Sequence, residues 1–365
     1  MSRFLLVSPP VYDFKLYDEW MNPFGLMAVS DLLKQGGHEV VLIDGLFAHE
    51  KTKKFGTGFF QRQEIPLPEP LKFMERPYYR FGKPFEIFSK EIEHAGFDAA
   101  FVGGFLTYWY PGVFEAIRLL KIFYPHKPVI LGGIYPTLCP DHARTFSGAD
   151  RIFQSSASYS NLKTLLESLN FKLEIKNPLP GLDLNLVGKK PFFSLLLSSG
   201  CPYRCTYCAS SVLNPEHFFY RLPEPGFFKQ GYDEGIRDLA FLDDALLYDL
   251  DALKKFIGGL EEQSVFFRYH TPNGLHLNRI TPETARFLKA SGFETLRFGL
   301  ESLEPEWESK SGGKAKWNTV VNAVQYLKEA GFSKKQLGLY LLLSPESRLD
   351  AVEETLLKLE DLRVN

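Results

Sequence analysis

The sequence has few cysteines, almost no excess charge and no long apolar runs. Its 365 residues include 42 Lys and Arg and 44 Asp and Glu, for a formal net charge of −2, which argues against a broad nucleic-acid-binding surface. No stretch approaches 18 consecutive apolar residues, so we expect no membrane span. The apolar run after Met1 is too short for a secretory signal. With four cysteines in the whole chain, we expect a cytoplasmic protein without structural disulfides.

Three of these cysteines lie in one short segment, Cys201-Pro-Tyr-Arg-Cys205-Thr-Tyr-Cys208. The apolar run before it, residues 192–197, predicts a buried strand. Three thiolates on the loop that leaves a strand can hold three irons of a [4Fe–4S] cluster, and the fourth iron would stay open to a small molecule. A zinc site would need four ligands, and His217 is the nearest candidate for a fourth. A closed cluster would also need a fourth ligand.

This spacing, with the aromatic Tyr207 just before the third cysteine, resembles the radical S-adenosylmethionine (SAM) superfamily. The resemblance implies a [4Fe–4S] cluster on the three cysteines, with the open iron chelated by the amino and carboxylate groups of SAM. It also implies that an electron from the cluster cleaves SAM to a 5′-deoxyadenosyl radical, which abstracts hydrogen from a small-molecule substrate. The implied electron donor is a flavodoxin or a ferredoxin.

Alternating strand and helix patterns predict two α/β domains. Residues 1–158 predict a doubly wound, Rossmann-like parallel sheet with a Pro- and aromatic-rich insertion at 47–88. We expect a linker at 159–190 and, in 191–365, the partial (βα)6-type barrel of radical SAM proteins, with functional groups at the carboxyl ends of its strands. No sixth strand precedes Asn365, so we expect a truncated or unusually short barrel. The barrel strands are predicted at 192–197, 238–242, 265–269, 295–298 and 338–343.

The insertion is too apolar for a disordered linker. Two interpretations are open: a lid over a ligand, or an arm packed on the body of the domain. In a lid, the contacts to an anionic or planar ligand would come from Arg76, Tyr78, Tyr79 and Arg80.

The N-terminal domain resembles the cobalamin-binding domain that precedes many radical SAM domains. The resemblance rests on Leu5-Leu-Val-Ser-Pro-Pro10, Asn22-Pro-Phe-Gly-Leu26 and Val129-Ile-Leu-Gly-Gly-Ile-Tyr-Pro-Thr137. It implies that Gly132, Gly133 and Thr137 contact the nucleotide tail or a corrin amide. Alternatively, the two glycines form a tight strand-to-helix turn. The Asp-x-His-x-x-Gly motif is absent, which leaves open both cobalamin without a protein histidine on cobalt and a domain that binds only substrate.

Polar residues follow the predicted barrel strands, at the edge where a barrel carries its site. His270 is a candidate general acid or base. For Asp243 and Asp244 the alternative to ligand binding is helix capping, and for Asn273 it is turn formation. The resemblance implies these cofactor contacts: Tyr207 beside the cluster, Asp243 and Asp244 at the SAM amino group, Asn273 at the ribose or backbone, Glu301 and Ser302 near the ribose and carboxylate, and Lys310 or Lys314 at the carboxylate.

The sequence therefore predicts a radical SAM enzyme of small-molecule biosynthesis. With cobalamin, the implied reaction is methyl transfer to an unactivated carbon or phosphorus centre, or a radical rearrangement. Without cobalamin, the N-terminal domain would serve the substrate. From a different class, the alternative is a non-enzymatic metal-binding or electron-transfer module.

Overall fold

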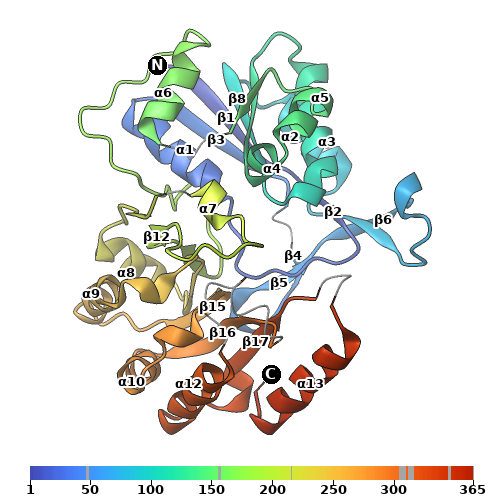
Figure 1. The fold of residues 1–365 in the computed structure, drawn as a ribbon. Helices are drawn as coiled ribbons and strands as arrows, with labels where there is room; N and C mark the ends of the chain where they lie inside the picture. The colour runs from blue at the N-terminus through green and yellow to red at the C-terminus, as the bar shows by residue number, and fades with distance from the viewer. Residues whose placement is uncertain are drawn as a thin grey trace. The chain divides into compact units, whose positions relative to one another are not determined.

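The chain divides into two compact units, Met1–Lys190 and Pro191–Asn365 (Figure 1). The computed structural model describes residues 1–46, 49–154, 158–214, 216–303, 310, 316–343 and 347–364. Among these residues, no helix has the length and apolar character needed to cross a membrane.

Unit 1 is built around a five-stranded parallel sheet in the order β10-β9-β8-β1-β3. In chain order this is the 2-1-3-4-5 arrangement of a doubly wound fold, which confirms the predicted Rossmann-like domain. Its sheet strands are β1 (Arg3–Ser8), β3 (Glu39–Asp44), β8 (Ala99–Gly104), β9 (Val129–Gly133) and β10 (Arg151–Phe153). Its helices are α1 (Phe24–Gln35), α2 (Phe85–Glu93), α3 (Tyr110–Phe123), α4 (Ile134–Leu138), α5 (Pro140–Phe146) and α6 (Tyr159–Glu167).

The apolar run of β1 supplies both cores of unit 1, because successive side chains of a strand point to opposite faces. Phe4 and Leu6 pack with the side of the sheet that carries α1 and α6. Leu5 and Val7 pack with the side that carries α2 and α3 (Figure 1). A strand buried on both faces is apolar throughout, as this one is.

Residues 159–190 were expected to be a linker, and the structure corrects this. Helix α6 buries Leu162 and Leu166 in the same core as α1, and Leu173 joins them. At the end of the segment, the buried Lys190 donates to the side chain of Asn22 at 2.7 Å. The segment is therefore an integral part of unit 1.

The insertion forms small antiparallel elements. Strand β7 (Tyr78–Phe81) lies between β2 (Val11–Asp13) and β6 (Arg62–Ile65), and β4 (His49–Thr52) pairs with β5 (Gly58–Phe60). Arg80 and Glu115 of α3 form an ion pair of 2.6 Å, with side chains only 4% and 5% exposed. Arg80 is thus buried against the body of unit 1 and is not a ligand contact, which favours the packed arm over the lid for this strand.

Unit 2 carries a second parallel sheet, in the order β11-β14-β15-β16-β17, as the alternating βα pattern predicts. The predicted third strand at 265–269 is shifted: the observed strand starts at Arg268 and runs through Leu275. The strands of unit 2 are β11 (Phe193–Leu195), β12 (Ser198–Ser199), β13 (Phe218–Phe219), β14 (Asp238–Phe241), β15 (Arg268–Leu275), β16 (Phe293–Glu301) and β17 (Leu337–Leu341). Its helices are α7 (Ser210–Leu213), α8 (Pro225–Asp233), α9 (Leu250–Glu261), α10 (Pro282–Ala290), α12 (Trp317–Glu329) and α13 (Leu349–Asp361).

Candidate functional site

The cysteine segment is a loop closed at its base by a short antiparallel pair. Ser198 and Ser199 of β12 pair with Phe219 and Phe218 of β13. Gly200 starts the loop with a φ of 88°, and a Cβ there would lie 2.7 Å from the carbonyl oxygen of Glu216. Only glycine allows this backbone approach, so the loop leaves the strand in one defined direction.

None of the three cysteines of this loop is in a disulfide bond. Cys205 is buried, Cys201 is half-buried and Cys208 is exposed. The Cys208 amide donates to the Cys205 carbonyl at 3.1 Å, and the Ser210 amide lies 3.5 Å from the Cys208 sulfur. Across the described residues, no three Cys, His, Asp or Glu side chains are close enough together to hold one metal ion. A [4Fe–4S] cluster instead spreads its thiolate ligands over separate irons, so these thiols fit it in number, type and placement on one loop.

Two adjacent aspartates after β14 hold both ends of the loop. The Asp243 carboxylate accepts hydrogen bonds from the Leu197 amide at 3.1 Å and from the Ser198 amide and hydroxyl at 2.7 and 2.9 Å. Asp244 accepts from the hydroxyl of Ser210, two residues after the third cysteine, at 2.6 Å. These bonds tie the entry and the exit of the loop to one turn of the barrel sheet.

Asp243 is 2% exposed, and burial raises its pKa to about 6 although its three hydrogen bonds lower it. A carboxylate buried in this way is not accessible to the SAM amino group, which corrects the expected role of Asp243. Asp244 is half-buried and is the member of the pair that a cofactor could reach.

The cysteine loop also contacts the segments that follow β15 and β16. Tyr203 exchanges hydrogen bonds with the side chain of Asn278 and packs edge-on against His276 at 4.6 Å between ring centroids. Tyr207 lies beside Glu301: burial raises the pKa of its phenol most, and Glu301 and Cys205 raise it further. The predicted cofactor contacts Tyr207 and Glu301 are thus brought together with the cysteines.

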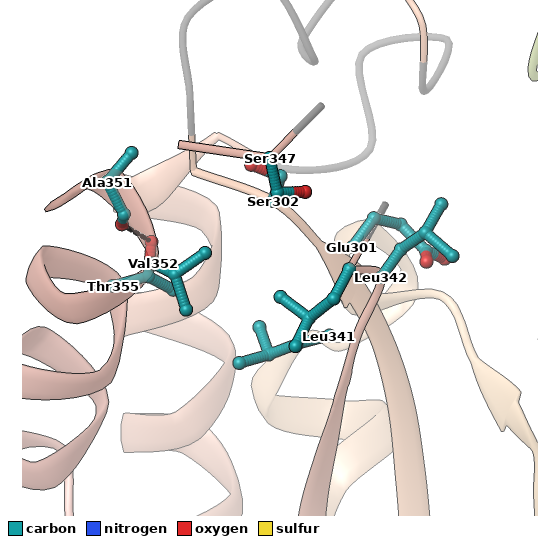
Figure 2. A pocket seen from close by; sticks show the side chains of 9 residues that line it. Glu301, Ser302, Leu341, Leu342, Ser347, Ala351, Val352 and Thr355 are labelled. Atoms are coloured by element: carbon teal, nitrogen blue, oxygen red, sulfur yellow. Dashed lines mark hydrogen bonds between the residues drawn. The ribbon is translucent and has the colours of Figure 1, made fainter. Parts of the chain in front are cut away.

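Glu301 ends β16 in the left-handed region, at a φ of 69°, which costs about 1–3 kcal/mol for a residue other than glycine. Figure 2 shows its carboxylate on the opposite side of the strand ends from Val352 and Thr355 of α13. Glu301 and Ser302 also line a cavity between the strand ends and α13. Its volume is about 10 Å³, which is room for about one water molecule.

Asn273 lies in a bulge of β15, where the pairing with β16 shifts between Thr271 and Leu275. Its amide nitrogen donates to the Leu242 and Asp243 carbonyls at 3.0 and 3.3 Å. Asn273 therefore joins the carboxyl ends of two neighbouring strands. Its contact to a ribose stays a prediction, as does the role of Ser302, and Lys314 lies outside the described residues.

His270 does not lie at the carboxyl edge. It is fully buried, with its ring nitrogens 2.8 Å from the Thr295 hydroxyl and 3.0 Å from Asp238, the first residue of β14. Burial lowers the pKa of this imidazole, and the bond to Asp238 raises it. A histidine with both nitrogens bonded and no exposed surface is a structural residue, which replaces the expected acid–base role.

In unit 1, the pair Gly132-Gly133 ends β9 and leads directly into α4. Gly133 has a φ of 105°, and a Cβ there would lie 2.5 Å from the Gly104 carbonyl oxygen. The Thr137 hydroxyl donates to the Gly133 carbonyl at 2.8 Å. Both residues thus have local structural roles that match the strand-to-helix turn, and their contact to a corrin ligand stays a prediction.

The sequence interpretation missed the residues that position the cysteine loop: Ser198, Gly200, Tyr203, Ser210, His276 and Asn278. The available signal was the Ser-Ser-Gly run directly before the first cysteine. The hydrogen-bond partners of Ser198, Tyr203 and Ser210 are 34 to 75 positions away in the chain, so sequence spacing alone could not connect them.

Comparison with known proteins adds independent information. Residues 195–359 match the family model of the radical SAM superfamily. An uncharacterized methyltransferase, PH0819, of Pyrococcus horikoshii is 24% identical over 188 residues, 49% of this chain and 40% of the relative. The bacteriochlorophyllide d C-12(1)-methyltransferase of Chlorobaculum tepidum is 23% identical over 199 residues, 49% of this chain and 43% of the relative. These matches therefore span less than half of either curated relative.

A solved structure has a similar fold over nearly the whole chain. It is that of the cobalamin-dependent SAM radical enzyme OxsB with aqua-cobalamin and SAM bound, with a TM-score of 0.65 and 16% identity, covering 99% of this chain and 52% of that one. At this identity the likeness concerns the fold. The family match over the cysteine loop and the second sheet shows that the chain contains a domain of the radical SAM superfamily.

Proposed function

We propose that Cys201, Cys205 and Cys208 hold a [4Fe–4S] cluster that works with SAM on a small-molecule substrate. The observation that carries the proposal is the loop itself, which brings three cysteines outside any disulfide together and is anchored at both ends by Asp243 and Asp244. When bound and reduced, the cluster would supply the electron that starts radical chemistry on SAM. Flavodoxin or ferredoxin is the class of protein that would deliver this electron.

The chain's own residues orient the cofactors in this proposal. The buried Asp243 keeps the loop entry in place, while Asp244 offers a carboxylate for the cationic amino group of SAM. Tyr207 of the loop lies beside Glu301, and these two residues would recognise a planar base and a ribose hydroxyl. Only Cys205 of the three is buried, so it is the thiolate that the protein itself shields from water.

We further propose that unit 1 binds cobalamin, and that the reaction is then a methyl transfer. The doubly wound sheet supports this, because such folds bind ligands outside the carboxyl ends of their strands. Exposed rings are available at this edge after β8, since Phe105 is 42% and Tyr108 59% exposed. The cobalamin dependence of OxsB and the methyltransferase names of the two curated relatives support this proposal. The alternative is a radical SAM enzyme whose unit 1 binds only substrate.

Anaerobic reconstitution with iron and sulfide, followed by absorption and EPR spectra, tests the proposal. We expect a reduced [4Fe–4S] signal that shifts on adding SAM and is lost in Cys205→Ala, while Cys139→Ala, which removes the cysteine outside the loop, keeps it. Corrin absorption retained after gel filtration with hydroxocobalamin would support the cobalamin branch. Zinc in place of iron, or a signal insensitive to SAM, would refute the cluster assignment.

A further inference from the structure

The strand register of unit 2 sorts the side chains of its sheet onto two faces, since paired residues of parallel strands share a face. One face is apolar: Leu239, Tyr269 and Phe293 are paired in one row, and the rings of this face contact α8 and α9. Neighbouring positions point the other way, and a register shift after the Tyr269–Phe293 pair brings Thr295 opposite His270, so that Thr295 and Arg297 share the face of His270. We call this second side the inner face; its residues are Ser194, Asp238, Ala240, Arg268, His270, Thr295, Arg297, Gly299, Gly338 and Tyr340.

The inner face carries two arginines in different electrostatic settings. Arg268 is paired with Asp238 through two bonds of 2.8 and 2.7 Å. Arg297 is half-buried, and its Nη1 donates to the carbonyl of Leu296 at 3.1 Å. Within the described part of the chain, no carboxylate lies at ion-pair distance from Arg297. A cation withdrawn from water without a counter-charge is costly, so an anionic ligand would be strongly favoured beside it.

The residue opposite Arg297 leaves room for its guanidinium. Gly338 of β17 is its direct partner in the sheet. A Cβ at Gly338 would lie 2.9 Å from Cδ of Arg297 and 3.1 Å from both Nε and Nη1. The missing side chain therefore allows the guanidinium to lie across the edge strand. Tyr340, two residues further along β17 on the same face, is held by a 2.7 Å bond from its hydroxyl to the Pro272 carbonyl.

Arg297 lies well below the proposed cofactor site. It precedes Glu301 by four residues on β16, a distance of about 13 Å along a parallel strand. Under the proposed function, SAM binds at the level of Tyr207 and Glu301, with its own carboxylate and amino group directed to the cluster. The guanidinium is then available to the substrate. Its distance from the carboxyl edge of the sheet is about the length of a small metabolite.

We infer that Arg297 anchors an oxyanion of the substrate, a carboxylate or a phosphate, on the inner face of the barrel. This inference rests on the proposed function and adds the chemical class of its substrate. A planar guanidinium binds both groups through two parallel hydrogen bonds. The anchored end of the substrate lies deep in the partial barrel, and its reacting atom lies near the cysteine loop.

Anion binding by the full chain tests the inference without knowledge of the substrate. Inorganic phosphate and sodium acetate are titrated separately against the chain, with sodium chloride at equal ionic strength as the reference, and thermal shift gives the affinity. We expect at least one of the two anions to bind, and Arg297→Met to weaken its affinity about tenfold or more. The matched control is Arg286→Met, which removes an equal charge from the exposed face of α10 and should change nothing. Phosphate and acetate distinguish the two oxyanions.

Two further measurements keep the test decisive. Gly338→Ala retains the charge but displaces the guanidinium, so it should also weaken anion binding, which guards against misfolding of Arg297→Met. SAM binding to the reconstituted chain should be unchanged in Arg297→Met. Equal anion affinity in wild type and Arg297→Met, or loss of SAM binding instead, would overturn the inference. Failure of cluster assembly would overturn the proposed function alone, since the anion titrations are done on the apo chain.

Discussion

Removing the carboxylate of Glu115 should destabilise unit 1 strongly. Its two oxygens accept from Arg80 Nε at 3.2 and 3.0 Å, from Arg80 Nη2 at 2.6 Å and from the Tyr12 hydroxyl at 2.5 Å. Glu115→Leu would leave the Arg80 guanidinium buried without its counter-charge, which costs about 3–5 kcal/mol. For a unit of this size, that corresponds to a fall in melting temperature of roughly 10 °C.

Urea unfolding of the apo chain, followed by the fluorescence of Trp109 in unit 1, measures this cost. The double variant Arg80→Met/Glu115→Leu should recover most of the loss, because apolar residues can replace a buried pair at little cost. Lys83→Met is the control, since its pair with Glu91 is partly exposed and should contribute less than about 1 kcal/mol. The assignment of a buried, coupled pair would be wrong if Glu115→Leu cost no more than this control. It would also be wrong if the separate costs of Arg80→Met and Glu115→Leu added up in the double variant.

Three further predictions concern other parts of the chain. Because the pKa of Asp243 is raised to about 6 from 3.8, the folded chain binds more protons than the unfolded chain between these values, so this group's stabilisation falls by about 3 kcal/mol as the pH rises from 4 to above 6. Denaturant unfolding across this range should show the fall in wild type and not in Asp243→Asn; parallel curves would contradict it. Gly133→Ala should lower the free energy of unfolding by about 2–3 kcal/mol, because Gly133 has a φ of 105° and a Cβ would contact Gly104. Gly258→Ala within α9, which has open space around it, should raise the free energy of unfolding by about 0.5–1 kcal/mol. Equal effects in thermal melts would count against this reasoning. In the apo chain, Cys208 should react with a thiol reagent faster than the buried Cys205, and peptide mass spectrometry that found the reverse order would disprove the loop geometry.

Several features could be predicted from the sequence because their signals are local. The CxxxCxxC spacing identifies the loop of the proposed cluster, and the alternating βα pattern identifies two parallel sheets. Both depend on near neighbours in the chain: apolar runs make buried strands, and three thiols within eight residues necessarily share one loop. The predicted fourth strand, residues 295–298, contains Arg297, but the observed β16 continues to Glu301, which the sequence had placed after the strand.

The partners of these residues are decided by the tertiary structure. Asp243 and His270 were predicted to face ligands, and Arg80 was a candidate ligand contact if the insertion formed a lid. A polar residue at a strand end or in an aromatic insertion looks the same whether its partner is a ligand or the protein. The fold places Asp243 against the entry of the cysteine loop, His270 between Asp238 and Thr295, and Arg80 on Glu115. Each of these contacts joins positions 25 to 45 residues apart. The sequence by itself determined which chemistry the cysteine loop can support. Only the packed structure decided which polar groups already have protein partners and which, such as Arg297 in our inference, are available to a ligand. The reason is that desolvation and hydrogen-bond pairing depend on neighbours that are distant in the chain.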